Sequence, residues 1–158
     1  MLLWFLGTGL LTVWFVFTDP RFDYRLLLVG VLLPDLIDVP FGDSRWAHSL
    51  TVTVGVMVLV MLATAGRKPI RRLLLGLPIG MLLHLVWDGA FTATKVFWWP
   101  FSGSWGNTRV PSLERGWLNL ALELAGAAML LWAWKRFKLA EPERRREFMR
   151  SGVLRERA

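Results

Sequence analysis

Long runs of apolar residues constrain the fold of this chain more than any other feature. Residues 1–18, 47–65, 73–94 and 117–134 each approach the length of about 20 residues that an apolar helix needs to cross a bilayer. A fifth run, 26–41, is apolar in its first half and then acquires polar residues. We therefore expect an all-α, polytopic membrane protein with about five transmembrane helices, the second of them short or kinked.

The basic residues predict how these helices are oriented. If all five runs cross the membrane and the N-terminus lies outside, all but four of the 19 Lys and Arg residues fall on the inner side. The exceptions are Arg45, Lys95, Arg109 and Arg115. Because Lys and Arg concentrate in cytoplasmic loops, this distribution favours an N-out, C-in topology. The first run lacks a basic n-region and a cleavage site, so we expect it to be a retained anchor.

The net charge of +7 arises mainly from the C-terminal end of the chain. We predict a transmembrane helical domain over residues 1–137 and a basic cytoplasmic tail over residues 138–158, in which Pro142 can open a short helix. Anionic lipid headgroups attract such a tail. It has few aromatic residues and no nucleic-acid-binding motif, so the expected partners are membrane lipids and not nucleic acid.

Ionisable residues interrupt the apolar runs at six positions. They are Asp35, Asp38, His48, His84, Asp88 and Glu123. Each carboxylate near a helix centre costs about 2.5–3.5 kcal/mol on insertion scales, and no run contains a Lys or Arg to neutralise it. In the five-helix topology all six residues fall in the outer halves of their helices. Protonation, hydrogen bonds or a bound cation must offset this cost, so the six residues indicate a functional site.

The row of residues that ends in His84 and Asp88 begins with Gly76 and Gly80, each four positions apart. Residues at this spacing share one helix face. The two glycines predict that a neighbouring helix approaches closely, and the polar pair then faces that same helix farther out. Pro78 on this helix can add a bend.

A metal site is the interpretation that we favour for the ionisable residues. Because the chain has no Cys, the ligands must be nitrogen and oxygen donors. We expect one or two divalent ions, most simply Zn²⁺ and otherwise Mn²⁺ or Fe²⁺. The predicted ligands are Asp35, Asp38, His48, His84 and Asp88. Two alternatives stay open, namely a proton-coupled transporter or channel that uses the acids as a relay, and a non-enzymatic membrane scaffold.

The string LLPDLIDVPFGDSRWAHSL, followed by HLVWDGAF and FWWPFSG, resembles the YdjM-like family of bacterial inner-membrane proteins, which are described as membrane-bound metal-dependent hydrolases. The resemblance covers about residues 28–102. The matching residues are Pro34, Asp35, Asp38, His48, Ser49, His84, Asp88, Trp99, Pro100, Phe101 and Ser102. The family pattern has a further His near the position of Asp43, which is either an oxygen ligand or a residue without a role in the site.

The resemblance implies a hydrolase of the bacterial inner membrane. A metal ion with an open coordination position lowers the pKa of a bound water towards 7, and we expect Glu123 to orient or deprotonate that water. Lys95, Arg109 and Arg115 lie in the outer connection and are the predicted binding residues for an anionic headgroup. A site in the outer leaflet favours an ester or phosphoester of a lipid-like substrate.

Overall fold

The computed structural model describes residues 1–154 apart from 18, 20, 39, 41–45 and 104–115. These residues form helices and contain no strand. The longer helices are α1 (Leu2–Phe17), α2 (Tyr24–Asp38), α3 (Leu50–Ala63), α4 (Lys68–Asp88) and α7 (Leu118–Arg136). The shorter ones are the 3-10 turns η2 (Trp46–His48) and η3 (Ala90–Thr92), and the helices α5 (Thr94–Phe97) and α8 (Pro142–Ser151).

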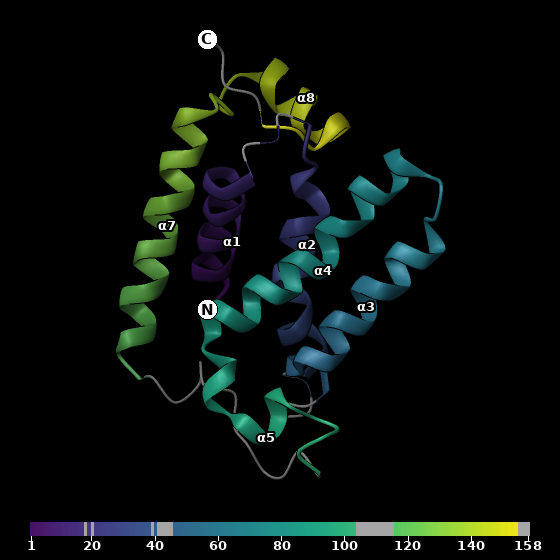
Figure 1. Ribbon diagram of the computed structural model, residues 1–158. Coiled ribbons are helices and arrows are strands. Elements are labelled where there is room, and N and C mark those ends of the chain that lie inside the picture. Colours follow the sequence, from purple (N-terminus) through teal and green to yellow (C-terminus); the bar gives the residue numbers. More distant parts are fainter. Residues whose placement is uncertain (18, 20, 39, 41–45, 104–115, 155–158) are drawn as a thin grey trace.

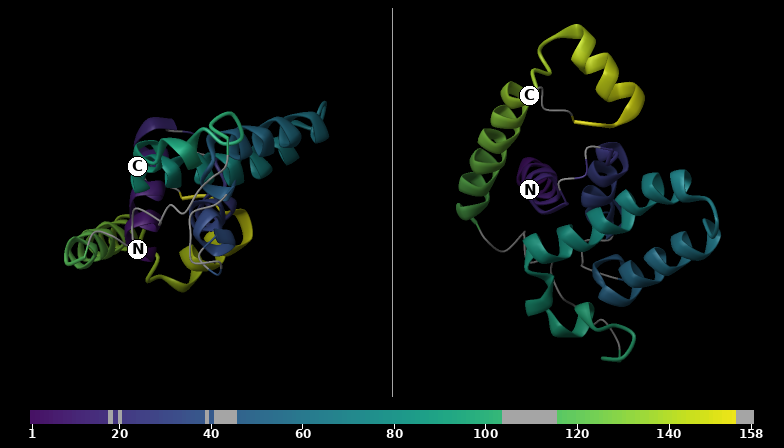
Figure 2. Two further views of the ribbon diagram at one scale, coloured as in Figure 1. Left: turned by 90° about the horizontal axis from the view of Figure 1, so that it is seen from below. Right: turned by 45° about the horizontal axis from the view of Figure 1, so that its top comes forward.

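The helices are arranged between two ends of the molecule (Figure 1). The α8 end carries α8, the start of α2 and the end of α7, whereas the α5 end carries α5, η2 and the last turns of α2 and α4. α1 packs between α7 and α2, and α2 packs on α4. Both views of Figure 2 show the hairpin of α3 and α4 extending away from α7.

Each of the five apolar runs overlaps one of the longer helices, so the prediction of an all-α fold is confirmed. α2 is short, with 15 residues, and contains Pro34, as expected. Within the described part of the chain, α4 alone is long and apolar enough to cross a membrane by length and composition, and α1 and α3 are apolar but shorter. The five crossings and their orientation therefore stay predictions.

Glycines bring the backbones of α2 and α4 into contact. A Cβ atom on Gly80 of α4 would overlap the carbonyl oxygen of Leu27 and lie 2.6 Å from the backbone nitrogen of Val31. From the other side, a Cβ atom on Gly30 of α2 would overlap the carbonyl group of Leu77. Gly80 is thus a close-packing residue, as its spacing predicted.

Two helices bury small or polar residues and expose their large apolar ones. Thr53 is the only buried residue of α3, whereas Leu59 and Leu62 are 66% and 69% exposed. α7 buries Gly126 and Ala133 and exposes leucines along its outer face. A water-soluble protein of this size seldom leaves such continuous apolar faces uncovered.

Basic residues are distributed unequally between the two ends. Among the described residues, Lys95 is the only Lys or Arg at the α5 end. The α8 end carries Arg21 before α2, Arg25 in the first turn of α2, the basic start of α4 and the basic end of α7. α8 begins at Pro142, as predicted, and folds back on the bundle, where Leu154 and Phe148 join the hydrophobic core.

We predict that Gly80→Ala destabilises the protein and that Gly55→Ala does not. The added methyl group of Gly80→Ala overlaps backbone atoms of α2, and overpacking of this kind costs about 1–3 kcal/mol. Gly55 is an exposed helical residue of α3 with no atom within 4 Å of its Cβ position, so alanine there is expected to stabilise by about 0.5–1 kcal/mol. Thermal unfolding in detergent measures both changes. Equal stability of the two variants would contradict the backbone contact.

Candidate metal centre

Three elements meet at the α5 end and bring together residues that are distant in the sequence. The last turns of α2 carry Asp35 and Asp38, the turn η2 carries His48, and the last turns of α4 carry His84. One donor atom each from Asp35, His48 and His84 lies within 4.8 Å of the other two. The structure therefore confirms that three of the five predicted ligands converge.

The Asp35 carboxylate lies between the two imidazole rings. Its Oδ1 atom is 3.4 Å from Nε2 of His48 and 3.5 Å from Nε2 of His84. Two ligand atoms bound to one zinc ion at 2.0–2.2 Å with a tetrahedral angle lie about 3.3–3.6 Å apart. Both observed separations fall in this range, so the three atoms can share one small cation.

The other nitrogen of each ring has an acceptor of its own. Nδ1 of His48 lies 2.8 Å from Oδ2 of Asp38, and Nδ1 of His84 lies 2.7 Å from the carbonyl oxygen of Val31. Because a carbonyl oxygen only accepts hydrogen bonds, Nδ1 of His84 donates to it, and the Asp38 carboxylate selects the same tautomer of His48. In the neutral rings, both Nε2 lone pairs are then directed towards Asp35.

When both rings are neutral, three hydrogen-bond acceptors face one another without a proton between them. Within the described residues, Oδ1 of Asp35 and Nε2 of both rings are buried and have no hydrogen-bond partner. Buried acceptors in this state are costly. Histidines that bind metals commonly donate their second ring N–H to a carboxylate or a carbonyl, as both do here. A divalent cation coordinated by the three atoms would satisfy all of them.

The site is closed on the imidazole side and open at Asp35. The side chains of His48 and His84 are 1% and 0% exposed, whereas Asp35 is 23% exposed. The Phe5 ring covers His84, with ring centroids 4.1 Å apart. A bound ion would therefore be reached past the Asp35 carboxylate.

Ser49 fixes the turn that carries His48. Its Oγ accepts a hydrogen bond from the backbone N–H of Thr51, 3.1 Å away, and so caps α3. The same hydroxyl donates to the carbonyl oxygen of Trp99, at 2.7 Å. This pair of bonds joins η2 to the segment that contains Trp99, and both residues belong to the motifs quoted above.

The other two predicted ligands lie beside the group of three. Asp38 is fully buried and holds Nδ1 of His48 instead of extending to Nε2. Asp88 is fully buried one helical turn beyond His84 and contributes no atom to the group. Its ligand role stays a prediction, and the geometry assigns Asp38 to the support of His48.

Glu123 does not join this group. Its Oε2 accepts a hydrogen bond from the backbone N–H of Leu3 at 2.8 Å, and its Oε1 lies 3.5 Å from the amine of Met1. The carboxylate therefore caps the first turn of α1, where the helix dipole favours a negative charge. The predicted catalytic role requires Glu123 to contact a metal-bound water, whereas its carboxylate contacts the start of α1.

The predicted substrate-binding residues are only partly visible in the structure. Lys95 is exposed on α5 at the same end as the metal centre. Arg109 and Arg115 lie outside the described residues, as does Asp43. The Val31 carbonyl was not predicted, and no sequence signal could have found it, because every residue carries the same carbonyl group.

Comparisons with known proteins add no relative. No family model matches the chain, and neither a curated protein nor a solved structure is similar to it. The resemblance to the YdjM-like family therefore rests on the motif residues alone.

Proposed function

We propose that this chain is a polytopic membrane protein that binds a divalent metal ion through Asp35, His48 and His84 and hydrolyses an ester or phosphoester. One observation carries the proposal: three donor atoms lie within 4.8 Å of one another, the two carboxylate-to-imidazole separations match edges of a zinc tetrahedron, and both imidazoles are held at Nδ1 by acceptors. A histidine that only packs in a protein core does not require acceptor atoms of two other residues opposite its Nε2 atom.

The donor set fits a catalytic ion better than a structural one. Two imidazoles and one carboxylate are the ligands of several zinc hydrolases, whereas structural zinc sites are closed by four protein ligands and usually include Cys. When bound, such an ion supplies Lewis acidity and lowers the pKa of a water in its open position towards 7. Asp38 and Val31 orient the two rings, and the exposed edge of Asp35 leaves a path for substrate.

The membrane part of the proposal is supported by the surface of the molecule. The outer faces of α3 and α7 are apolar, and the described basic residues gather at the α8 end. By the positive-inside rule, the α8 end then faces the cytoplasm and the metal centre lies in the outer half of an inner membrane.

Exposed aromatic residues favour a lipid-like substrate. Trp98, Phe101 and Trp117 are 51%, 83% and 82% exposed at the α5 end. Tryptophan side chains concentrate at the level of lipid headgroups. An ester or phosphoester bond near a headgroup would therefore lie at the depth of the metal centre, with Lys95 beside it.

We predict one divalent metal ion per wild-type chain and none in His84→Ala. The measurement is elemental analysis of detergent-purified protein after loading with Zn²⁺ or Mn²⁺ and removal of free metal. Glu123→Gln is the matched control, because Glu123 is an acid outside the site, and this variant should keep the metal. The same preparations should hydrolyse a short-chain phospholipid only when they hold metal. Wild-type protein that takes up no metal would favour the proton-relay alternative.

Asp38→Asn should weaken metal binding without abolishing it. Asparagine keeps the size of the side chain but removes the charge that holds Nδ1–H of His48, and loss of such a partner typically costs about 10–100-fold in affinity. Competition with a chelator measures the dissociation constant. An affinity equal to that of the wild type would show that Asp38 does not support the ligand.

Single cysteines can test the orientation, since the chain has no native Cys. Thr94 on α5 and Glu143 on α8 are both exposed. In intact cells, a membrane-impermeant maleimide should label Thr94→Cys, and it should label Glu143→Cys only after the cells are opened. The reverse pattern would place the metal centre on the cytoplasmic side.

A further inference from the structure

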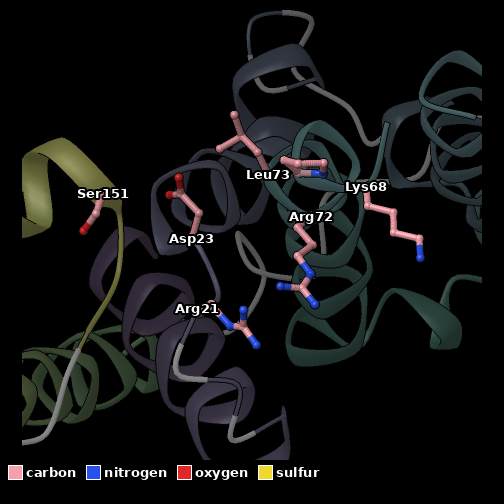
Figure 3. A pocket seen from close by; sticks show the side chains of 7 residues that line it. Arg21, Asp23, Lys68, Arg72, Leu73 and Ser151 are labelled. Carbon is pink, nitrogen blue, oxygen red and sulfur yellow. The ribbon is translucent and has the colours of Figure 1, made fainter. Parts of the chain in front are cut away.

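A cavity with charged residues in its lining lies at the α8 end, away from the metal centre. Its volume is about 450 Å³, which falls within the range of small-ligand sites. The residues that line it come from the α1–α2 connection, the start of α4 and the end of α8 (Figure 3). They are Arg21, Asp23, Lys68, Pro69, Arg72, Leu73 and Ser151. Lys68 and His84 are separated by about 24 Å along α4 at 1.5 Å per residue, so the two sites are independent.

The cavity carries an excess of positive charge. Its one acid, Asp23, is already paired with Arg25, whose Nε lies 3.0 Å from Oδ1 and whose Nη2 lies 2.5 Å from Oδ2. Among the described residues, no carboxylate forms an ion pair with the side chains of Arg21, Lys68 or Arg72. The nearby Asp19 carboxylate accepts a hydrogen bond from the backbone N–H of Arg21 at 2.9 Å. In Figure 3 the side chains of Arg21 and Arg72 extend towards the same region of the cavity.

The start of α4 increases this excess. α4 has no acidic residue in its first turn and no side-chain hydrogen bond at its N-cap. Its N-cap residue is Arg67 and its first residue is Lys68, so both carry positive charge. Cationic side chains and the positive end of a helix dipole repel one another, whereas an anion is favoured there. An anion in the cavity would therefore offset both the cationic side chains and the dipole.

The wall formed by the end of α8 is held in place by hydrogen bonds. Arg25 donates from Nη1 to the carbonyl oxygens of Met149 and Arg150, at 3.0 and 3.1 Å. The backbone N–H of Tyr24 donates to the carbonyl oxygen of Gly152 at 2.8 Å. Gly152 has a φ of +69°, and the space beside it is filled by the Asp23 carboxylate. Two of the segments beside the cavity, the start of α2 and the end of α8, are thus joined to each other.

We infer that this cavity binds a phosphate group. Two guanidinium groups and one ammonium group suit phosphate oxygens, and arginine can bind them with two parallel hydrogen bonds. In the proposed topology the cavity lies at the cytoplasmic side, where basic pockets between helices hold the headgroups of anionic lipids. The phosphate can belong to such a lipid or to a soluble phosphate compound.

The test is a titration of the detergent-solubilised full chain in phosphate-free buffer, in which isothermal titration calorimetry measures binding. The two probes are dihexanoyl phosphatidic acid and inorganic pyrophosphate. We expect Arg21→Gln/Arg72→Gln to weaken binding at least tenfold. The control pair Lys138→Gln/Arg145→Gln removes the same charge at the same end outside the cavity and should change binding less than twofold.

The outcomes separate the two sources of phosphate. Tight binding of the lipid alone identifies a headgroup site, and comparable binding of pyrophosphate identifies a site for a soluble phosphate compound. No binding of either probe, or equal losses in the two variant pairs, would overturn the inference. Metal content is measured in all variants and should stay at the wild-type value, so the result is independent of the metal centre. Arg72→Gln alone is the milder variant. Circular dichroism should show that it keeps the fold, and calorimetry should show that it weakens binding.

Discussion

The close crossing of α2 and α4 is the contact on which the candidate metal centre depends. Gly80 leaves room for the α2 backbone at Leu27 and Val31. One helical turn farther along α4, His84 occupies the same face and donates to the Val31 carbonyl at 2.7 Å. A larger residue at position 80 would separate the two backbones, and the ring of His84 would then lose its acceptor. The close approach of the two helices at Gly80 therefore also determines the tautomer of His84.

The bundle buries several ionisable groups and exposes many large apolar side chains. His48, His84, Asp38 and Asp88 are at most 1% exposed, while leucine and tryptophan side chains cover the surface. Burial of ionisable groups is unfavourable unless each finds a partner. The Nδ1 atoms have hydrogen-bond acceptors, whereas the Nε2 atoms face the Asp35 carboxylate at 3.4 and 3.5 Å without a hydrogen bond. One donor atom each of Asp35, His48 and His84 lies within 4.8 Å of the other two, so a single cation coordinated there would satisfy all three.

The sequence predicted the features that depend on the spacing of residues within one helix. It did not predict the features that depend on how different helices pack against one another. The apolar runs predicted the longer helices, and the row through Gly80 and His84 predicted a helix face that the structure contains. Asp35 and Asp38 share a face, so their spacing could not decide which of them meets the ligand nitrogens and which supports His48. Glu123 was grouped with the site because of its depth, but α7 packs on α1, and this places its carboxylate at the start of α1.

The direction of α4 relates the two proposed sites electrostatically. Its peptide dipoles place partial positive charge at Lys68 and partial negative charge near Asp88. Each interaction of a charge with a helix end contributes about 0.3–1 kcal/mol, and more where water is excluded. A cation held by His84 in the last turns of α4 is therefore favoured by the same dipole that opposes Lys68 and Arg72 at its start. An anion at the start and a metal ion near the end would both align with the dipole. The basic residues at the start are then explained by the ligand that they bind as well as by the membrane side on which they lie.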